Sequence, residues 1–255
     1  MGYRTRVSAV GVAAISAASL AFVGSASAAF PDFTGCPSTS PGATACVDIQ
    51  SQSGSVNIKG FNVPLGHSLE IRGALAPTDT GSTFFPAAGT NGFIAQPVQV
   101  PGGLLGIDLP LSINMVTATA ALAGPSSAIQ VDPNSVSISM PIKLELSNPL
   151  LGPGCQIGSN SNPVHVTLIT GTTNPPAPNR PITGTLGSPA IVDGNFVIAG
   201  NTNVDNAFSI PGASNCGLGL GLINAVVNAK LKLPSAGGNN SMSIDNDVAL
   251  QPIIG

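Results

Sequence analysis

Charged and aromatic side chains are scarce in this sequence. Charged residues make up 7% of the 255 residues, whereas an ordinary globular domain has about 25%. No run of basic residues is present to neutralise phosphates, which argues against a nucleic-acid partner. Tryptophan is absent and the single tyrosine is Tyr3, so aromatic stacking platforms for sugars or bases are limited to a few phenylalanines.

Residues that commonly carry catalysis are equally few. The two histidines, His67 and His165, are both expected on the polar, solvated face of an alternating strand. Residues 66–70 (GHSLE) resemble the G-x-S-x-G nucleophile elbow, but end in glutamate where the tight turn requires glycine. Residues 245–247 (DND) lack the turn glycine and the distal glutamate of a calcium loop. We therefore predict no catalytic site, no cofactor and no bound metal.

The N-terminal residues 1–28 are typical of a secretory signal peptide. Arg4 and Arg6 give a positive start, residues 7–24 are apolar, and an A-x-A cleavage site ends the segment. The apolar run is too short and too diluted by small polar residues for a permanent membrane span. We predict a secreted protein without a transmembrane span, released or loosely held at the cell surface. Removal of the leader, which holds two of the eight basic residues, leaves residues 29–255 with a formal net charge of −5.

The chain has four cysteines, Cys36, Cys46, Cys155 and Cys216. In an exported protein this number predicts two disulfides, for which three pairings exist. We favour Cys36–Cys46 and Cys155–Cys216, because each cysteine lies in a turn rich in Gly, Pro and Ser and the first two are close in sequence. No C-x-x-C motif supports a zinc site. Two bridges within one β domain, 29–255, are expected.

Short apolar/polar alternations, separated by Gly, Pro, Asn and Asp, run through most of the chain. One pair, 46–50 and 55–59, flanks polar residues and predicts a hairpin with its turn at 51–54. A second pair flanks Asp193 and Gly194, a dipeptide that favours the positive φ angles of a tight hairpin turn. Further strands are expected at 67–72, 135–140, 142–146, 164–168, 190–192, 195–198 and 242–250. The pattern predicts an all-β fold, either an antiparallel β-sandwich or a Greek-key barrel.

One segment departs from this pattern. A single short helix is expected near 218–230, where apolar residues recur at helical spacing from Leu222 to Ala229. A short closing strand is expected to follow at 231–233. The Pro-rich loop 172–181 lies between the third and fourth cysteines, so their pairing would place this loop inside one domain.

Two long apolar segments, 104–115 and 218–233, have two possible roles. If they are exposed, they form a patch for lipid or for self-association. If they are buried, they are part of the core. A β domain of this size needs such segments in its interior, so we expect both of them there.

Four stretches of the C-terminal half belong together: PGC at 153–155, NPP at 174–176, DNAF at 205–208, and residues 222–240. This set resembles a group of small exported proteins of actinobacteria. The resemblance implies export and a bridge that includes Cys155, and it implies no activity.

These observations predict a secreted, non-catalytic cell-envelope or extracellular protein with a structural or adhesive role. Its partners would be cell-wall or lipid components, or a second copy of the chain. The first alternative is a carrier for a hydrophobic ligand or lipid, which requires a connected apolar cavity of several hundred Å³. The second alternative is a secreted hydrolase, which requires His67 or His165 within hydrogen-bond reach of a hydroxyl and a carboxylate.

Overall fold

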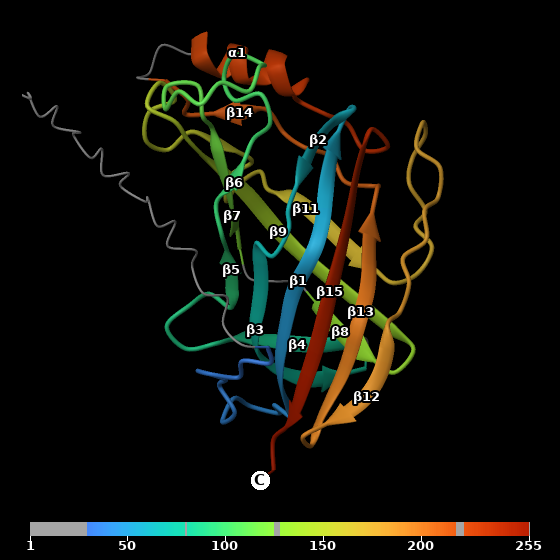
Figure 1. The fold of residues 1–255 in the computed structure, drawn as a ribbon. Coiled ribbons are helices and arrows are strands. Elements are labelled where there is room, and N and C mark those ends of the chain that lie inside the picture. The colour runs from blue at the N-terminus through green and yellow to red at the C-terminus, as the bar shows by residue number, and fades with distance from the viewer. Residues whose placement is uncertain (1–29, 80, 125–127, 218–221, 255) are drawn as a thin grey trace, which may run out of the picture.

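A computed structural model of the chain describes residues 30–79, 81–124, 128–217 and 222–254. The predicted signal peptide, 1–28, lies outside these ranges. The described residues form an antiparallel, all-β fold with one helix, which confirms the predicted fold class (Figure 1). Within the described ranges, no helix has the length and apolar character needed to cross a membrane.

All strands belong to one hydrogen-bonded sheet. The strands are β1 (Ala45–Ile58), β2 (Phe61–Pro64), β3 (Leu69–Thr78), β4 (Gly81–Pro86), β5 (Phe93–Ala95), β6 (Val98–Gln99), β7 (Thr117–Leu122), β8 (Ala128–Asp132), β9 (Ser135–Ser147), β10 (Gln156–Ile157), β11 (Val164–Ile169), β12 (Ser188–Val192), β13 (Asn195–Asp205), β14 (Ala213–Ser214) and β15 (Asn240–Pro252), and the helix is α1 (Leu222–Leu231). The main path through the sheet is β14-β10-β9-β11-β13-β15-β1-β3-β4. Of the remaining strands, β2 pairs with β1, β5 with β3, β7 and β8 with β9, and β12 with β13, while β6 pairs with β7.

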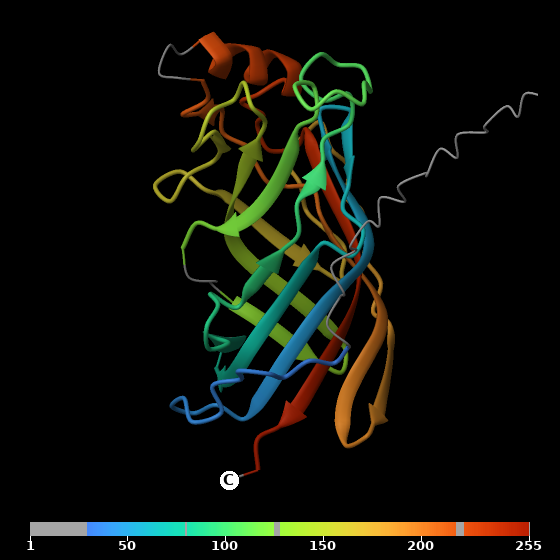
Figure 2. The ribbon, with the colours of Figure 1, turned by 60° about the vertical axis from the view of Figure 1, so that its left-hand side comes forward.

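The sheet folds over on itself as a sandwich. Strands β1, β3, β13 and β15 form one layer, and β7, β8, β9 and β11 cross behind them (Figures 1 and 2). The two layers also meet along one side, where β4 contacts β8 and β5 contacts β7. The interior is filled by the alternating apolar residues of both layers, among them Val47, Ile49, Ile138, Val166 and Val248.

The hairpin expected between 46–50 and 55–59 is wrong. Both segments belong to the single long strand β1, which pairs with β15 along its whole length. The register shifts between Ser51 and Ser53, so the polar residues form a β-bulge and not a turn. Gly54 is required by close approach, since a Cβ there would lie 2.6 Å from the carbonyl oxygen of Ser243.

Other local predictions are confirmed. Asp193 (φ 49°) and Gly194 (φ 80°) form the tight turn between β12 and β13. The expected strands at 135–140 and 142–146 join through Pro141 into β9, and residues 164–168 fall within β11. In the first part of β9 and in β11 every second residue is buried, as the apolar/polar alternation predicts.

Both favoured disulfides are present, Cys36–Cys46 and Cys155–Cys216. The second bridge spans the Pro-rich loop 172–181, which leaves the sheet after β11 and returns before β12.

The C-terminal end of α1 has the geometry of a helix cap. Lys232 has a left-handed backbone (φ 54°), and the N–H of Leu233 donates to the carbonyl of Asn228 (2.8 Å). The closing strand expected at 231–233 is therefore wrong, because these residues form the helix ending.

Candidate functional site

An apolar pocket lies between the two layers of the sheet, in the half of the molecule nearer α1. We call it the seam pocket, because residues of β2, which is hydrogen-bonded to β1, and of β6, which is hydrogen-bonded to β7, line it together. The lining side chains of β2 and β6 stay partly exposed, and the pocket is partly open. It is lined by Val56, Ile58, Phe61, Val63, Leu65, Ser68, Leu69, Gln96, Val98, Val100, Ala118, Ala120, Leu144, Leu146, Ile157 and Leu231.

Small residues on β7 leave this space open. Ala118 and Ala120 point into the pocket at alternate positions, opposite Leu146 and Leu144 of β9. The residue between them, Thr119, faces a polar groove on the other side of the strand. An alanine face beside large neighbours cannot fill the gap between the layers, so a cavity remains.

The seam pocket has a free cavity volume of about 70 Å³, within a recess whose empty space, including the part open to solvent, is about 620 Å³. One water molecule needs roughly 10–15 Å³ of such free volume, and also two to four polar partners to hold it. Nearly all of the lining is aliphatic or aromatic, and none of it is charged. Apolar matter therefore suits this space better than water does.

Two polar residues line the pocket, Ser68 and Gln96. They are adjacent, since the backbone N–H of Gln96 donates to the carbonyl of Ser68 (2.7 Å). Gln96 is exposed, whereas Ser68 is buried and its hydroxyl oxygen has no hydrogen-bond partner among the described residues. A buried hydroxyl without a partner is unfavourable by itself, so Ser68 offers one hydrogen bond to a bound molecule.

A second, smaller cavity of about 30 Å³ continues the apolar space toward α1. It shares Val100, Leu146 and Leu231 with the seam pocket, and it extends between the loop after β6 and the outer face of α1 at Val226. The apolar lining therefore runs from the interior of the sheet to the surface beside the helix.

The loop 101–115 does not belong to the core, so the burial expected for 104–115 is wrong. Leu105 is 65% exposed and Ile107 is 57% exposed. The interior of the loop is occupied by Asn114, which accepts from the N–H of Leu105 and donates to the carbonyl of Ile107, both at 2.8 Å. Because an amide satisfies the backbone inside the loop, the apolar side chains project outward. Leu104 alone packs against the core.

The second apolar segment, 218–233, is divided between the two environments. Its first four residues, 218–221, lie outside the described ranges. Val227, Leu231 and Leu233 are buried, as expected, whereas Leu222 and Val226 are exposed.

The two histidines lie at the surface, and the DND motif lies in β15. His67 and His165 are both exposed, as predicted, and neither is hydrogen-bonded to a hydroxyl or a carboxylate in the part of the chain that the structure describes. Asp245 and Asp247 lie on the outer face of β15, where they accept hydrogen bonds from neighbouring strands. The described residues contain no group of His, Cys, Asp and Glu that could hold a metal ion.

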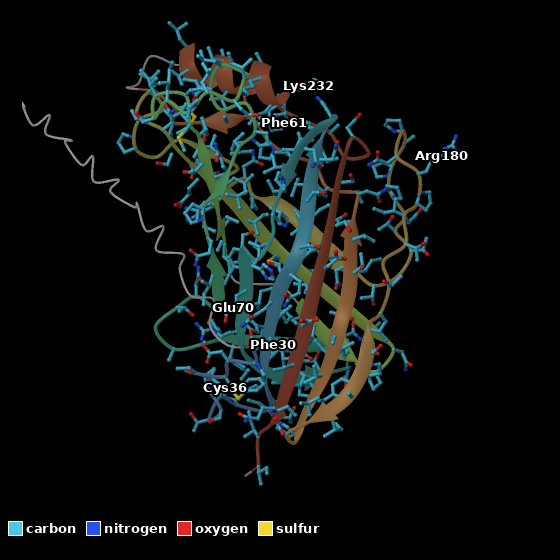
Figure 3. The ribbon with its side chains drawn as sticks, in the orientation of Figure 1. Phe30, Cys36, Phe61, Glu70, Arg180 and Lys232 are labelled. Atoms are coloured by element: carbon cyan, nitrogen blue, oxygen red, sulfur yellow. A yellow bond between two sulfur atoms is a disulfide. The ribbon has the colours of Figure 1, made fainter. Side chains whose placement is uncertain are left out.

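A cluster of charged residues, which the sequence patterns do not reveal, lies at the end of the molecule away from α1. Figure 3 shows Glu70 and Cys36 at this end, and Phe61 and Lys232 at the other. The acidic cluster consists of Asp32, Asp48, Glu70 and Arg72. Arg72 lies opposite Asp48 in the β1–β3 ladder and forms ion pairs with Asp32 and with Glu70 (2.9 Å).

Asp48 is the most buried member of this cluster. It is fully buried under the segment 30–44, and its Oδ2 atom accepts hydrogen bonds from the N–H of Asp32 (2.6 Å) and from the side chain of Gln50 (3.2 Å). Its Oδ1 atom has no partner among the described residues. Burial raises the pKa of Asp48 to about 7, against the lowering effect of the Asp32 hydrogen bond.

A broad polar groove of about 830 Å³ lies outside β9, and the ion pair Lys143–Glu145 (3.2 Å) is among its lining residues. Neither histidine lines it.

The chain has no match among protein-family models, among curated proteins or among solved structures. The resemblance to actinobacterial exported proteins stays a prediction.

Proposed function

We propose that this protein is a secreted binding protein, or carrier, for a hydrophobic ligand that occupies the seam pocket. The single observation that carries this proposal is the apolar, uncharged and partly open cavity between the two layers of the sheet. Sites for apolar ligands are concave and mostly apolar, with few polar groups that set the orientation. No comparable site among the described residues favours the hydrolase.

The lining also restricts the chemistry of the ligand. A charged group inside the pocket would lose its hydration without gaining a counter-ion, so the buried part of the ligand must be neutral. The hydroxyl of Ser68 suits a carbonyl or hydroxyl group at that point, and the exposed Gln96 suits a polar group closer to solvent. The free volume of about 70 Å³ encloses only a short apolar group, so a longer chain would extend into the open recess. The end of an acyl chain, or a short chain that carries an ester, an amide or an alcohol, has this chemistry.

Filling the pocket tests the proposal. Ala120→Phe places a ring in the cavity, so we expect its affinity for the apolar fluorophore N-phenylnaphthylamine to fall by about tenfold or more, which is about 1.4 kcal/mol of binding free energy. Thr119→Phe adds the same ring on the other side of the same strand and is the matched control. Binding is measured by fluorescence titration, and folding by far-UV circular dichroism. Equal affinities of wild type and Ala120→Phe would overturn the proposal.

The role of Ser68 has its own test. Ser68→Ala removes the hydroxyl with little change of shape, so we expect weaker binding of a fatty alcohol or ester by about fivefold, and unchanged binding of N-phenylnaphthylamine. Displacement of the fluorophore gives both affinities. If Ser68→Ala weakens the binding of both molecules equally, the hydroxyl does not form a hydrogen bond with a polar group of the ligand.

A further inference from the structure

Exposed large hydrophobic side chains gather at one end of the molecule. Among the described residues, eleven such side chains are exposed, and eight of them lie in three segments at the α1 end. We call this surface the cap and define it by the segments 101–115, 148–151 and 222–232. Its exposed hydrophobic residues are Leu105, Ile107, Leu111, Ile113, Met115, Leu150, Leu222 and Val226. Exposed apolar side chains gathered in this way mark an interaction surface.

The three segments of the cap are held together by specific contacts. The side chain of Asn148 donates to the carbonyls of Ile113 (2.9 Å) and Met115 (2.8 Å). The Nζ atom of Lys230, on α1, donates to the carbonyl of Gly102 (3.1 Å). The loop and the helix lie together at the extreme end of the molecule in both views (Figures 1 and 2). The cap is therefore a built surface with outward-facing apolar side chains.

Half of the basic residues that follow the predicted leader lie at the same end. Of the six basic residues that follow the predicted leader, Lys230 and Lys232 belong to the cap. Lys59 lies next to it, since its Nζ atom donates to the carbonyl of Lys232 (2.9 Å). None of these three lysines forms an ion pair with a residue that the structure describes. The one acidic residue of the cap is Asp108, whose carboxylate accepts from the N–H of Gly102 (2.6 Å).

We propose that the cap docks onto an anionic lipid bilayer. Its leucines, isoleucines and methionine enter the boundary between headgroups and acyl chains, and the three lysines lie at the level of the anionic headgroups. Elsewhere the chain is acidic, so the charge of the cap orients this end toward a negative surface.

A second copy of the chain fits this surface less well than a bilayer does. A two-fold contact of cap against cap would bring three lysines of one copy toward three of the other, and like charges oppose such a contact. An anionic bilayer complements both the apolar side chains and the lysines.

Docking of the cap does not depend on the proposed ligand, because the exposed hydrophobic residues of the cap do not line the seam pocket. The two features are nevertheless connected in space. The smaller cavity reaches the cap at Val226 and shares three lining residues with the seam pocket. A docked cap would therefore hold the apolar path close to the lipid.

The test is co-flotation of the purified protein, lacking residues 1–28, with vesicles of phosphatidylglycerol and phosphatidylcholine. We expect the wild type to float with these vesicles and to bind pure phosphatidylcholine vesicles about tenfold less. The double variant Ile107→Asp/Leu111→Asp should lose about tenfold or more in partitioning. The matched control is Ile191→Asp/Val192→Asp, which alters two exposed apolar residues on the β12 hairpin, outside the cap. It should bind as the wild type does.

The lysines have a separate variant. Lys59→Gln/Lys232→Gln, which leaves the hydrogen bond from Lys230 to Gly102 in place, should weaken binding to anionic vesicles and leave binding to neutral vesicles unchanged. Far-UV circular dichroism verifies that every variant is folded. Absence of wild-type flotation, or equal loss in both aspartate variants, would overturn the proposal. So would a dimer in solution that Ile107→Asp/Leu111→Asp dissociates. Flotation of Ala120→Phe, which blocks the seam pocket, shows docking independently of ligand binding.

Discussion

The two ends of the molecule use buried polar groups and charge in opposite ways. At the cap, a neutral amide, Asn114, is buried and satisfied by the loop backbone, while apolar side chains and lysines face outward. At the other end, a carboxyl group, Asp48, is buried with one oxygen unpaired, and the segment 30–44 covers it. The cap is built to expose apolar surface, and the acidic end is built to hold a covering segment in place.

Each end is also closed by one disulfide. Cys36–Cys46 ties the covering segment to β1, and Cys155–Cys216 ties the turn before β10 to the segment that leads into α1. The segments outside the strands have no ladder hydrogen bonds from the sheet. In this chain with few charges, they are held by the disulfides and by buried polar side chains such as Asn114 and Asp48. Substitutions of these buried polar residues and of the disulfide cysteines test the contribution of each end to stability.

The largest effect is expected at the acidic end. Because the pKa of Asp48 is raised from 3.8 to about 7 in the folded state, the fold favours its protonated form. The corresponding stability is fully present below pH 3.8 and is lost as pH rises through about 7. This shift corresponds to on the order of 4 kcal/mol. Asp48→Asn stays neutral, so we expect it to be more stable than wild type at pH 8 (about 4 kcal/mol) and to lack this pH dependence.

The measurement is urea unfolding followed by far-UV circular dichroism at acidic and at mildly alkaline pH. Asp205→Asn is the control, because both carboxylate oxygens of Asp205 accept backbone N–H bonds, from Thr167 and Ala207. An amide must lose one of these bonds, so this variant should be destabilised. The Asp48→Asn profile gives the pH dependence that comes from the other carboxylates. If the free energy of unfolding of the wild type, relative to that of Asp48→Asn, rises between pH 4 and 8, the pKa of Asp48 is not raised.

The two disulfides give the next effect. Their sequence separations are 61 for Cys155–Cys216 and 10 for Cys36–Cys46. Loop-closure entropy then predicts losses of about 4 and about 3 kcal/mol when each pair is replaced by serine. Urea unfolding of the two double variants under identical conditions measures the difference. A larger loss at Cys36–Cys46 would mean that the covering segment contributes more to the native state than loop closure alone predicts.

Local patterns predict the strands well because every second residue of a half-buried strand must be apolar, as in β9 and β11. They fail where a long-range partner decides. Residues 51–54 have the composition of a turn, yet the continuous pairing of β1 with β15 turns them into a bulge. The end of α1 likewise depends on the left-handed backbone of Lys232, the residue that follows the helix, and an apolar/polar sequence pattern cannot show this geometry.

The candidate site is harder to predict than the fold. The seam pocket depends on two alanines of β7 facing β2, which lies far away in sequence, and Ser68 matters only because it is buried there. Loop 101–115 is apolar enough to belong to a core, and only Asn114 in its interior turns its side chains outward. The available signal is the polar residue Asn114 within a largely apolar segment.

The smallest effect is expected from Asn114 itself. Asn114→Ala removes the hydrogen bonds to Leu105 and Ile107 and frees backbone groups that solvent reaches, so we expect a loss of about 1–2 kcal/mol. Asn91→Ala is the control at the opposite end, where an exposed side chain accepts one hydrogen bond of 3.3 Å from the N–H of Phe93. It should cost a few tenths of a kcal/mol. Limited proteolysis within loop 101–115 reports the local change. Faster cleavage there, together with weaker flotation on anionic vesicles, would connect the order of this loop to docking. Weaker flotation with unchanged cleavage would contradict that connection.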